Sequence, residues 1–149
     1  MKKFLITALV LSFISLTTQA QILTPVHWSY GAKKINKDEA VIFIKATIDD
    51  GWHVYSQYVK DGGPIKTSFT FPSSPGYILE GKTIEPTPIT RNEKVFKMDV
   101  SFFEHEVIFQ QKIKLKSGQA TVKGTLEYMT CNDRQCLPPD DIDFSITVK

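Results

Sequence analysis

The sequence of 149 residues is poor in cysteine. It has only two, Cys131 and Cys136, which lie close together. A framework of several disulfides is therefore excluded, and the fold must depend on an apolar core, for which the chain is long enough. The three histidines, His27, His53 and His105, lie on different segments. Because four residues between two cysteines is also a poor spacing for zinc, we expect no metal site.

Long apolar runs are also lacking. The longest, Phe4 to Leu16, has 13 residues, which is too short to span a bilayer comfortably. Lys2 and Lys3 precede this run and Thr18-Gln19-Ala20 follows it, as in a secretory signal peptide. We therefore predict a signal peptide at residues 1–20, cleaved near Ala20, and an exported protein without stable membrane insertion. A retained membrane anchor is the alternative.

An excess of charge is lacking as well in the expected mature chain, residues 21–149. Loss of Lys2 and Lys3 leaves 16 basic and 16 acidic residues, so the net charge is about zero. This balance argues against a surface for nucleic acid or for anionic membranes. No Ser/His/Asp arrangement, phosphate loop or paired-carboxylate motif stands out. The two cysteines are then the residues with the clearest chemistry.

What the chain does have is an alternation of apolar and polar residues. The clearest stretch places five residues on one face, namely Ala120, Val122, Gly124, Leu126 and Tyr128. Residues 142–148 repeat the pattern, and so do residues 112–116. A period of two is typical of half-buried antiparallel strands. The apolar run Val41 to Ile44 suits a more central strand.

Turn-forming residues separate these runs about every ten residues, and no segment has a helical period. The turn signals are Asp49-Asp50-Gly51, Asp61 to Pro64, Pro72 to Gly76, Ser117-Gly118 and Asn132-Asp133. Pro86 and Pro88 fit an edge strand or a connector, because proline cannot donate to a central ladder. Seven to nine short strands at this spacing predict an all-β fold. We expect a single domain at 21–149, an immunoglobulin-like antiparallel β-sandwich.

Both cysteines lie in the segment YMTCNDRQCLPP, Tyr128 to Pro139. In an oxidising compartment two cysteines this close are expected to form a disulfide. The four residues between them suit a hairpin loop, which brings the cysteines within bonding distance. A loop this short adds only about 2 kcal/mol of stability. If Tyr128 points into the core, the alternation places Met129 and Cys131 on the outer face, where a partner could reach the sulfur.

Three interpretations of the cysteine pair stay open from the residues alone. Most secreted disulfides are structural, so the bond can be a passive staple. It can also be a redox-active pair, since a stabilising bond would gain more by joining distant segments. Arg134 in the loop favours a thiolate, whereas Asp133 opposes it. A Cu(I) site formed by Cys131, Cys136 and Met129 is the third and weakest interpretation, because no Met-rich motif supports it.

The cysteine segment, with its aromatic lead-in and Pro-Pro exit, resembles the N-terminal periplasmic domain of the DsbD-type thiol:disulfide interchange proteins. The stretch Ile48 to Tyr55 is similar to the family's strand-turn-strand segment, and Gln119 to Pro139 to its final hairpin. The resemblance implies an immunoglobulin-like sandwich whose disulfide cycles without a bound cofactor. It also implies that a thioredoxin-like domain reduces the pair, which then passes electrons to periplasmic thiol proteins.

The resemblance also implies roles for individual residues. Cys136 would form the mixed disulfide and Cys131 would resolve it. His53, in place of a family aromatic, and Tyr55 would flank the pair. A segment shielding the disulfide would correspond to Thr90 to Phe96, where Phe96 is the aromatic candidate, although a core phenylalanine is the plainer interpretation.

Two departures from the family limit the transfer. The family typically has five residues between its cysteines, whereas this chain has four. The membrane-spanning and thioredoxin-like parts are missing from the sequence, so we expect a separate electron donor, such as a membrane electron-transfer protein with a thioredoxin-like domain. Our prediction is an exported thiol–disulfide interchange module. The alternative is a secreted immunoglobulin-like binding module whose disulfide is purely structural.

Overall fold

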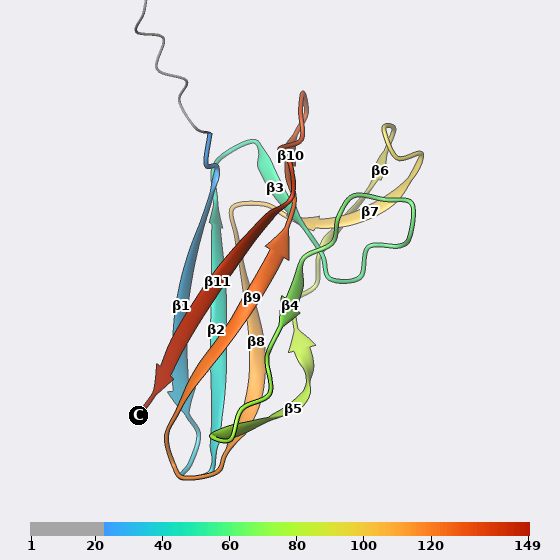
Figure 1. The fold of residues 1–149 in the computed structure, drawn as a ribbon. Helices are drawn as coiled ribbons and strands as arrows, with labels where there is room; N and C mark the ends of the chain where they lie inside the picture. Colours follow the sequence, from blue (N-terminus) through green and yellow to red (C-terminus); the bar gives the residue numbers. More distant parts are fainter. Residues whose placement is uncertain (1–22) are drawn as a thin grey trace, which may run out of the picture.

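The computed structural model describes residues 23–149, and the predicted signal peptide lies outside this range. The described residues form eleven strands, all paired antiparallel, with no helix among them (Figure 1). The strands are β1 (Val26–Lys34), β2 (Glu39–Ile48), β3 (Trp52–Tyr55), β4 (Ser68–Thr70), β5 (Tyr77–Ile84), β6 (Ile89–Glu93), β7 (Met98–Phe103), β8 (Glu106–Leu115), β9 (Ala120–Tyr128), β10 (Thr130–Asn132) and β11 (Asp140–Val148). The number exceeds the expected seven to nine because β3, β4 and β10 are only three or four residues long.

Two sheets form the body of the molecule. One has the order β1-β2-β8-β5 and the other the order β11-β9-β4, and they face each other along the long axis in Figure 1. The predicted alternation is confirmed in both, since the inward residues of β8, β9 and β11 are buried and their neighbours are exposed or half-buried. Val41 to Ile44 lies in β2, between β1 and β8, as expected for a central strand. The body is thus the antiparallel sandwich that the sequence indicates.

Aromatic side chains fill the core between these sheets. Phe109 of β8 has no exposed surface. Its ring lies 5.0 Å from that of Phe69, 5.9 Å from that of Phe103 and 6.3 Å from that of Trp28. Trp28 also meets the ring of Tyr128 edge to face at 5.2 Å. Because Phe69 belongs to β4 and Phe109 to β8, these contacts join the two sheets.

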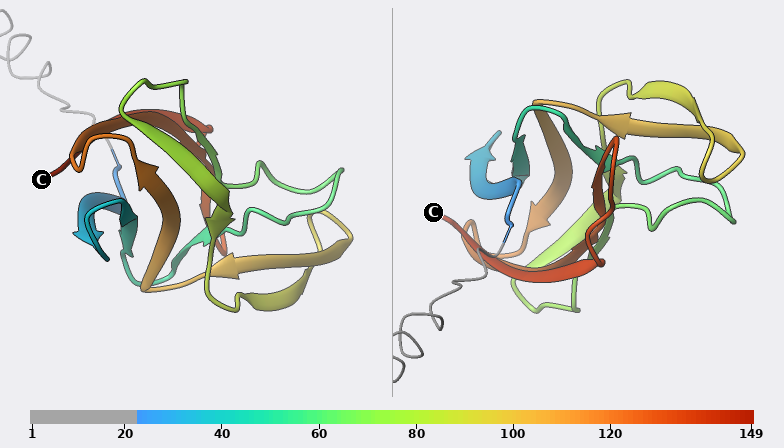
Figure 2. Two further views of the ribbon diagram at one scale, coloured as in Figure 1. Left: turned by 90° about the horizontal axis from the view of Figure 1, so that it is seen from below. Right: turned by 90° about the horizontal axis from the view of Figure 1, so that it is seen from above.

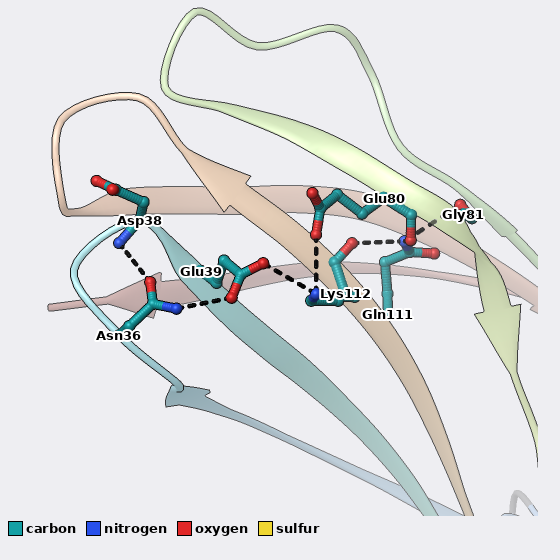
Figure 3. A network of polar contacts seen from close by, with 7 residues as sticks. All are labelled: Asn36, Asp38, Glu39, Glu80, Gly81, Gln111 and Lys112. Carbon is teal, nitrogen blue, oxygen red and sulfur yellow. Dashed lines mark hydrogen bonds and ion pairs between the residues drawn. The ribbon is translucent and has the colours of Figure 1, made fainter.

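A polar network crosses the outer side of the first sheet (Figure 3). Lys112 on β8 lies between two carboxylates, with its Nζ 3.0 Å from Glu39 of β2 and 3.3 Å from Glu80 of β5. Beside it β5 bulges between Glu80 and Ile84, where Gly81 has a φ of 70° that favours glycine. The buried amide of Gln111 donates to the backbone carbonyls of Lys112, Glu80 and Gly81, which satisfies acceptors near the bulge.

The third sheet, with the order β10-β3-β7-β6, stands at one end of the body. The predicted turn Asp49–Gly51 leads the chain into it from β2, and Gly51 there has a φ of 81°. Figure 2 shows the β6–β7 hairpin and the loop between β3 and β4 extending to the same side, away from the body. This sheet covers a second, smaller apolar cluster of Tyr55, Val100, Phe102 and Cys131. One half of the disulfide is therefore part of a core.

The connector from β5 to β6 carries Pro86 and Pro88, as predicted. Just before them, the carboxylate of Glu85 accepts a hydrogen bond from the Gln57 backbone N–H at 2.9 Å and another from the hydroxyl of Ser56. The Ser56 backbone N–H in turn donates to the carbonyl of Ser101 at 2.9 Å. These bonds hold the C-terminal end of β3, the strand that pairs with β10, against β7 and the connector.

Candidate functional site

The cysteine loop is a tight hairpin held by its own backbone. The N–H of Asn132 donates to the carbonyl of Gln135, and the side-chain oxygen of Asn132 accepts from the N–H groups of Arg134 and Gln135, each at 2.9 Å. Asparagine is suited to such a turn because its side chain can cap the following N–H groups. The disulfide between Cys131 and Cys136 closes the loop, with their Cα atoms 4.0 Å apart. The expected hairpin and bond are both present.

The two cysteines differ sharply in exposure. Cys131 is 2% exposed, whereas Cys136 is exposed. The prediction that Cys131 lies on the outer face was therefore wrong. The strand pattern is interrupted at Met129, after which β10 joins the third sheet and pairs with β3. The inward phase of β9 does not continue across this change of sheet, and Cys131 turns toward the second cluster.

A cavity of about 320 Å³ opens beside the disulfide. Its walls come from three places in the sequence: β3, the β6–β7 hairpin and the cysteine loop. The lining residues are His53, Tyr55, Arg91, Asn92, Glu93, Lys94, Val95, Phe96, Cys131, Asn132, Asp133 and Cys136. All the residues that the sequence analysis singled out for the site, namely Cys131, Cys136, His53, Tyr55 and Phe96, thus meet at one cavity.

Phe96 lies in the turn between β6 and β7, at the end of the segment Thr90 to Phe96. It is half-buried and packs against the second cluster, to which Cys131 belongs. It is therefore neither a residue of the main core nor a freely exposed side chain. The β6–β7 hairpin lines the same cavity as the two cysteines, and the shielding role that the resemblance implies for this segment stays a prediction.

His53 and Tyr55 form the floor of the cavity. His53 is 7% exposed and Tyr55 1% exposed. The Nε2 atom of His53 lies 3.1 Å from the hydroxyl of Tyr55, and the two rings meet edge to face at 5.1 Å. Burial lowers the pKa of His53 from its ordinary value of 6.5. Burial, together with the negative charge of Glu93, raises the pKa of Tyr55 to about 12. Both side chains are neutral at pH 7.

The sequence analysis missed the side chains that support this floor. The ring of Phe102 lies 4.8 Å from that of His53. The guanidinium of Arg91 lies over the same Phe102 ring, 5.0 Å from its centroid. Arg91 also approaches Glu104, with 3.6 Å between nitrogen and oxygen. The alternation of Met98, Val100 and Phe102 could have placed Phe102 on a buried face. No pattern in the sequence points to Arg91.

The fold and the site together define a class of protein: an immunoglobulin-like sandwich with a short-loop disulfide at one end, in which one cysteine is buried and the other is exposed. Residues 19–147 match the family described as "Thiol:disulfide interchange protein DsbD, N-terminal". Since the match covers nearly the whole chain, the protein belongs to the DsbD N-terminal family. None of the curated proteins matches the sequence.

Solved structures show the same fold. The reduced N-terminal domain of DsbD from Neisseria meningitidis is 19% identical, with a TM-score of 0.54 over 80% of this chain and 84% of that one. The N-terminal periplasmic domain of ScsB from Proteus mirabilis is also 19% identical, with a TM-score of 0.59, and 85% of this chain covers 49% of that chain. The present chain thus spans about half of the ScsB structure.

A third similar structure is a complex between the DsbD N-terminal and the PilB N-terminal domains from Neisseria meningitidis. Here the identity is 15% and the TM-score 0.55, over 84% of this chain and 87% of that one. At identities of 15–19%, these structural similarities show the fold alone. Within residues 23–149, no helix has the length and apolar character needed to cross a membrane.

Proposed function

We propose that the protein is a periplasmic thiol–disulfide interchange module in which Cys131 and Cys136 are the redox-active pair. The observation that carries this proposal is the unequal exposure of the two cysteines, which both line one cavity. Cys136 is open to a partner, whereas Cys131 is enclosed. A staple has no need of such asymmetry, but an exchange reaction requires one cysteine that meets the partner and one that resolves the mixed disulfide.

In the proposed cycle, a thiolate of a thioredoxin-like donor attacks the Sγ of Cys136 and Cys131 leaves. A second thiolate of the donor then attacks the donor sulfur of this mixed disulfide and frees Cys136. The domain is now in its dithiol form, and the donor carries the disulfide. The thiolate of Cys136 attacks the disulfide of a periplasmic client, and Cys131 attacks Cys136 to release the reduced client. Two electrons pass from donor to client, and no bound cofactor takes part. Family membership and the solved DsbD–PilB complex support a protein domain as the partner.

Trapping of the mixed disulfide tests the proposal. The variant Cys131→Ser should accumulate covalent adducts with periplasmic proteins through Cys136, because it lacks the resolving thiol. Cys136→Ser is the matched control, since its remaining thiol is buried, and it should accumulate few adducts. Mass spectrometry of the adducts would identify the partner. Equal trapping by both variants, or none by either, would contradict the assigned roles.

The reduction potential separates this proposal from the alternative of an inert binding module. A working couple should have a potential in the range of known redox proteins, whereas structural disulfides usually have potentials below about −300 mV. Equilibration with glutathione, followed by alkylation and mass measurement, gives the value. A potential well below that limit would leave the disulfide as a structural bond.

A further inference from the structure

His53 is the nearest titratable neighbour of the enclosed cysteine along the backbone ladder. β10 pairs with β3 so that Cys131 lies directly opposite His53. Side chains of directly opposed residues in an antiparallel pair point to the same face, with Cα atoms about 4.5–5.5 Å apart. Both residues line the cavity beside the disulfide. The side chains of His53 and Cys131 therefore lie on the same face and border one cavity.

The proposed function sets a chemical requirement at this place. After a partner is bound to Cys136, Cys131 must attack as a thiolate, because the thiol is a poor nucleophile. Cys131 is 2% exposed and belongs to an apolar cluster, and burial of this kind disfavours a charged sulfur. Solvent water is poorly placed to accept its proton. A base inside the cavity would remove this obstacle.

The hydrogen bonding of His53 suits it for accepting a proton. Within residues 23–149 its ring makes one hydrogen bond, through Nε2 to the Tyr55 hydroxyl at 3.1 Å. A tyrosine oxygen can accept from Nε2–H, which leaves Nδ1 with a free lone pair. When Nδ1 takes up a proton, the same oxygen still accepts from Nε2–H. Tyr55 therefore holds the ring in both of its protonation states.

The surrounding charges are arranged so that the ring is neutral at rest but can become charged. Burial dominates and lowers the pKa of His53. Among the groups that face it, Glu93 of β6, Glu104 after β7 and Asp133 of the cysteine loop favour the imidazolium, whereas Arg91 of β6 opposes it. Tyr55 on β3 stays neutral, as its pKa of about 12 requires. A base of this kind is unprotonated at pH 7, and three carboxylates stabilise it once it is protonated.

From this geometry we propose, building on the function proposed above, that His53 is the proton acceptor for the Cys131 thiol during resolution of the mixed disulfide. Tyr55 acts as the positioning residue that orients the imidazole. The step conserves atoms and electrons. The Cys131 S–H proton passes to His53, and the thiolate attacks the Sγ of Cys136. The Cys131–Cys136 bond forms, the bond from Cys136 to the partner breaks, and the partner sulfur leaves as a thiolate with two electrons.

An assay in which a small-molecule disulfide replaces the protein client measures this step without any contribution from partner recognition. The reduced protein is mixed with one equivalent of dithiobis(nitrobenzoic acid), whose released thiolate is coloured. Attack by Cys136 should release one thiolate in a first phase, and resolution by Cys131 should release a second. Cys131→Ser should show the first phase alone, which assigns the two phases. Stopped-flow absorbance measured from acid to neutral pH gives the rate of each phase.

His53→Gln should slow the second phase about 100-fold at pH 7, since general base catalysis commonly contributes at least that much. It should leave the first phase unchanged. In the unsubstituted protein the second rate should be level near pH 7 and fall in acid as the pH drops through the pKa of His53, which burial lowers. In His53→Gln it should instead rise about tenfold per pH unit, following the thiolate fraction. Tyr55→Phe should cause a smaller loss and keep the level region.

Two further variants make the test decisive. His53→Tyr preserves an aromatic ring on the cavity floor and should show the same loss, which guards against a misfolded glutamine variant. His27→Gln alters an exposed histidine outside the cavity and should change neither phase. An intact first phase with an unchanged second phase in both His53 variants would overturn the role of His53 alone. Absence of the first phase in the unsubstituted protein would overturn both this role and the proposed function.

Discussion

The body of the sandwich and its disulfide end are built on different scales. Five of the seven body strands, β1, β2, β8, β9 and β11, have nine or ten residues each. They enclose one large cluster of buried side chains. The strands of the third sheet have three to six residues and share a cluster of four fully buried side chains. Most of the buried apolar core therefore lies in the body, whereas the proposed reactivity lies at the end.

This division allows the chemistry to change without disturbing the fold. Cys131 is the only member of either buried cluster, within residues 23–149, whose covalent state changes in the proposed cycle. Opening of the disulfide removes one constraint from the small cluster and none from the large one. The comparison predicts that changes in the body alter the free energy of unfolding, whereas changes at the end alter the rate of thiol exchange.

The largest effect on stability should come from Phe109→Ala in the body. The Phe109 ring is fully buried and lies near three other aromatic rings, so its loss should cost about 3–5 kcal/mol of unfolding free energy. Denaturant unfolding measures this cost. The rate at which dithiothreitol opens the disulfide in the folded protein should not change, because the cavity contains no part of this ring.

Phe102→Ala is the matched control, since Phe102 is equally buried but belongs to the small cluster. Its ring contacts His53 and lies under the Arg91 guanidinium. We expect this variant to change the exchange rate as well as the stability. If Phe109→Ala alters the rate as much as Phe102→Ala does, the two regions are coupled and the division fails.

Reduction of the disulfide should have the next largest effect. Its loop joins cysteines five residues apart, and a loop of this size contributes about 2 kcal/mol in the chain-entropy account. Hydrogen exchange should show faster exchange of the β3, β7 and β10 amides in the reduced protein, while β2, β8 and β9 remain protected. Loss of protection spread evenly over both regions would contradict the comparison.

The body could be predicted from the sequence because its information is local. Alternation over residues 120–128 and 142–148 identifies strands with one buried face, and the structure pairs these two segments in register, with Leu126 opposite Ile142. In strands of this length the alternation remains recognisable even where one or two positions depart from it. Short strands such as β10 have too few residues to establish a phase, and for that reason the orientation of Cys131 was predicted wrongly.

The site depends on information that is not local. Its walls come from β3, from the β6–β7 hairpin and from the cysteine loop, which are brought together only by the third sheet. The residue patterns alone gave the two cysteines and their bond. His53, Tyr55 and Phe96 came from the family resemblance, whereas Arg91 and Phe102 became apparent only in the structure. Pairing of Cys131 with His53 requires the register of two strands that lie far apart in the sequence. The Thr130 hydroxyl, for example, donates to the carbonyl of His53, 77 positions away.

A smaller effect on stability, but a clear one on rate, should follow from Phe96→Ala. Phe96 is half-buried on the small cluster, so its truncation should cost about 1 kcal/mol, as is common for single substitutions. Loss of the ring uncovers one side of the disulfide, and dithiothreitol should therefore open it several-fold faster. Val95→Ala is the control at the same turn, because Val95 is 83% exposed. An equal acceleration in both variants would indicate a loosened hairpin rather than a lost cover.

The smallest effect should come from Lys112→Met on the outer side of the body. The hydrogen bond from Lys112 lowers the pKa of Glu39 from its ordinary value of 4.5. A carboxylate whose pKa is lower in the folded state stabilises the fold above its unfolded pKa, and that stabilisation disappears as the pH falls through the folded value. The substitution should therefore lower Tm slightly at pH 7 and much less in acid below pH 4.

Added salt should reduce the difference at pH 7, because exposed ion pairs are screened. Thermal unfolding at the two pH values, with and without salt, measures this. A shift in the rate of disulfide opening would show instead that this surface communicates with the cavity at the far end.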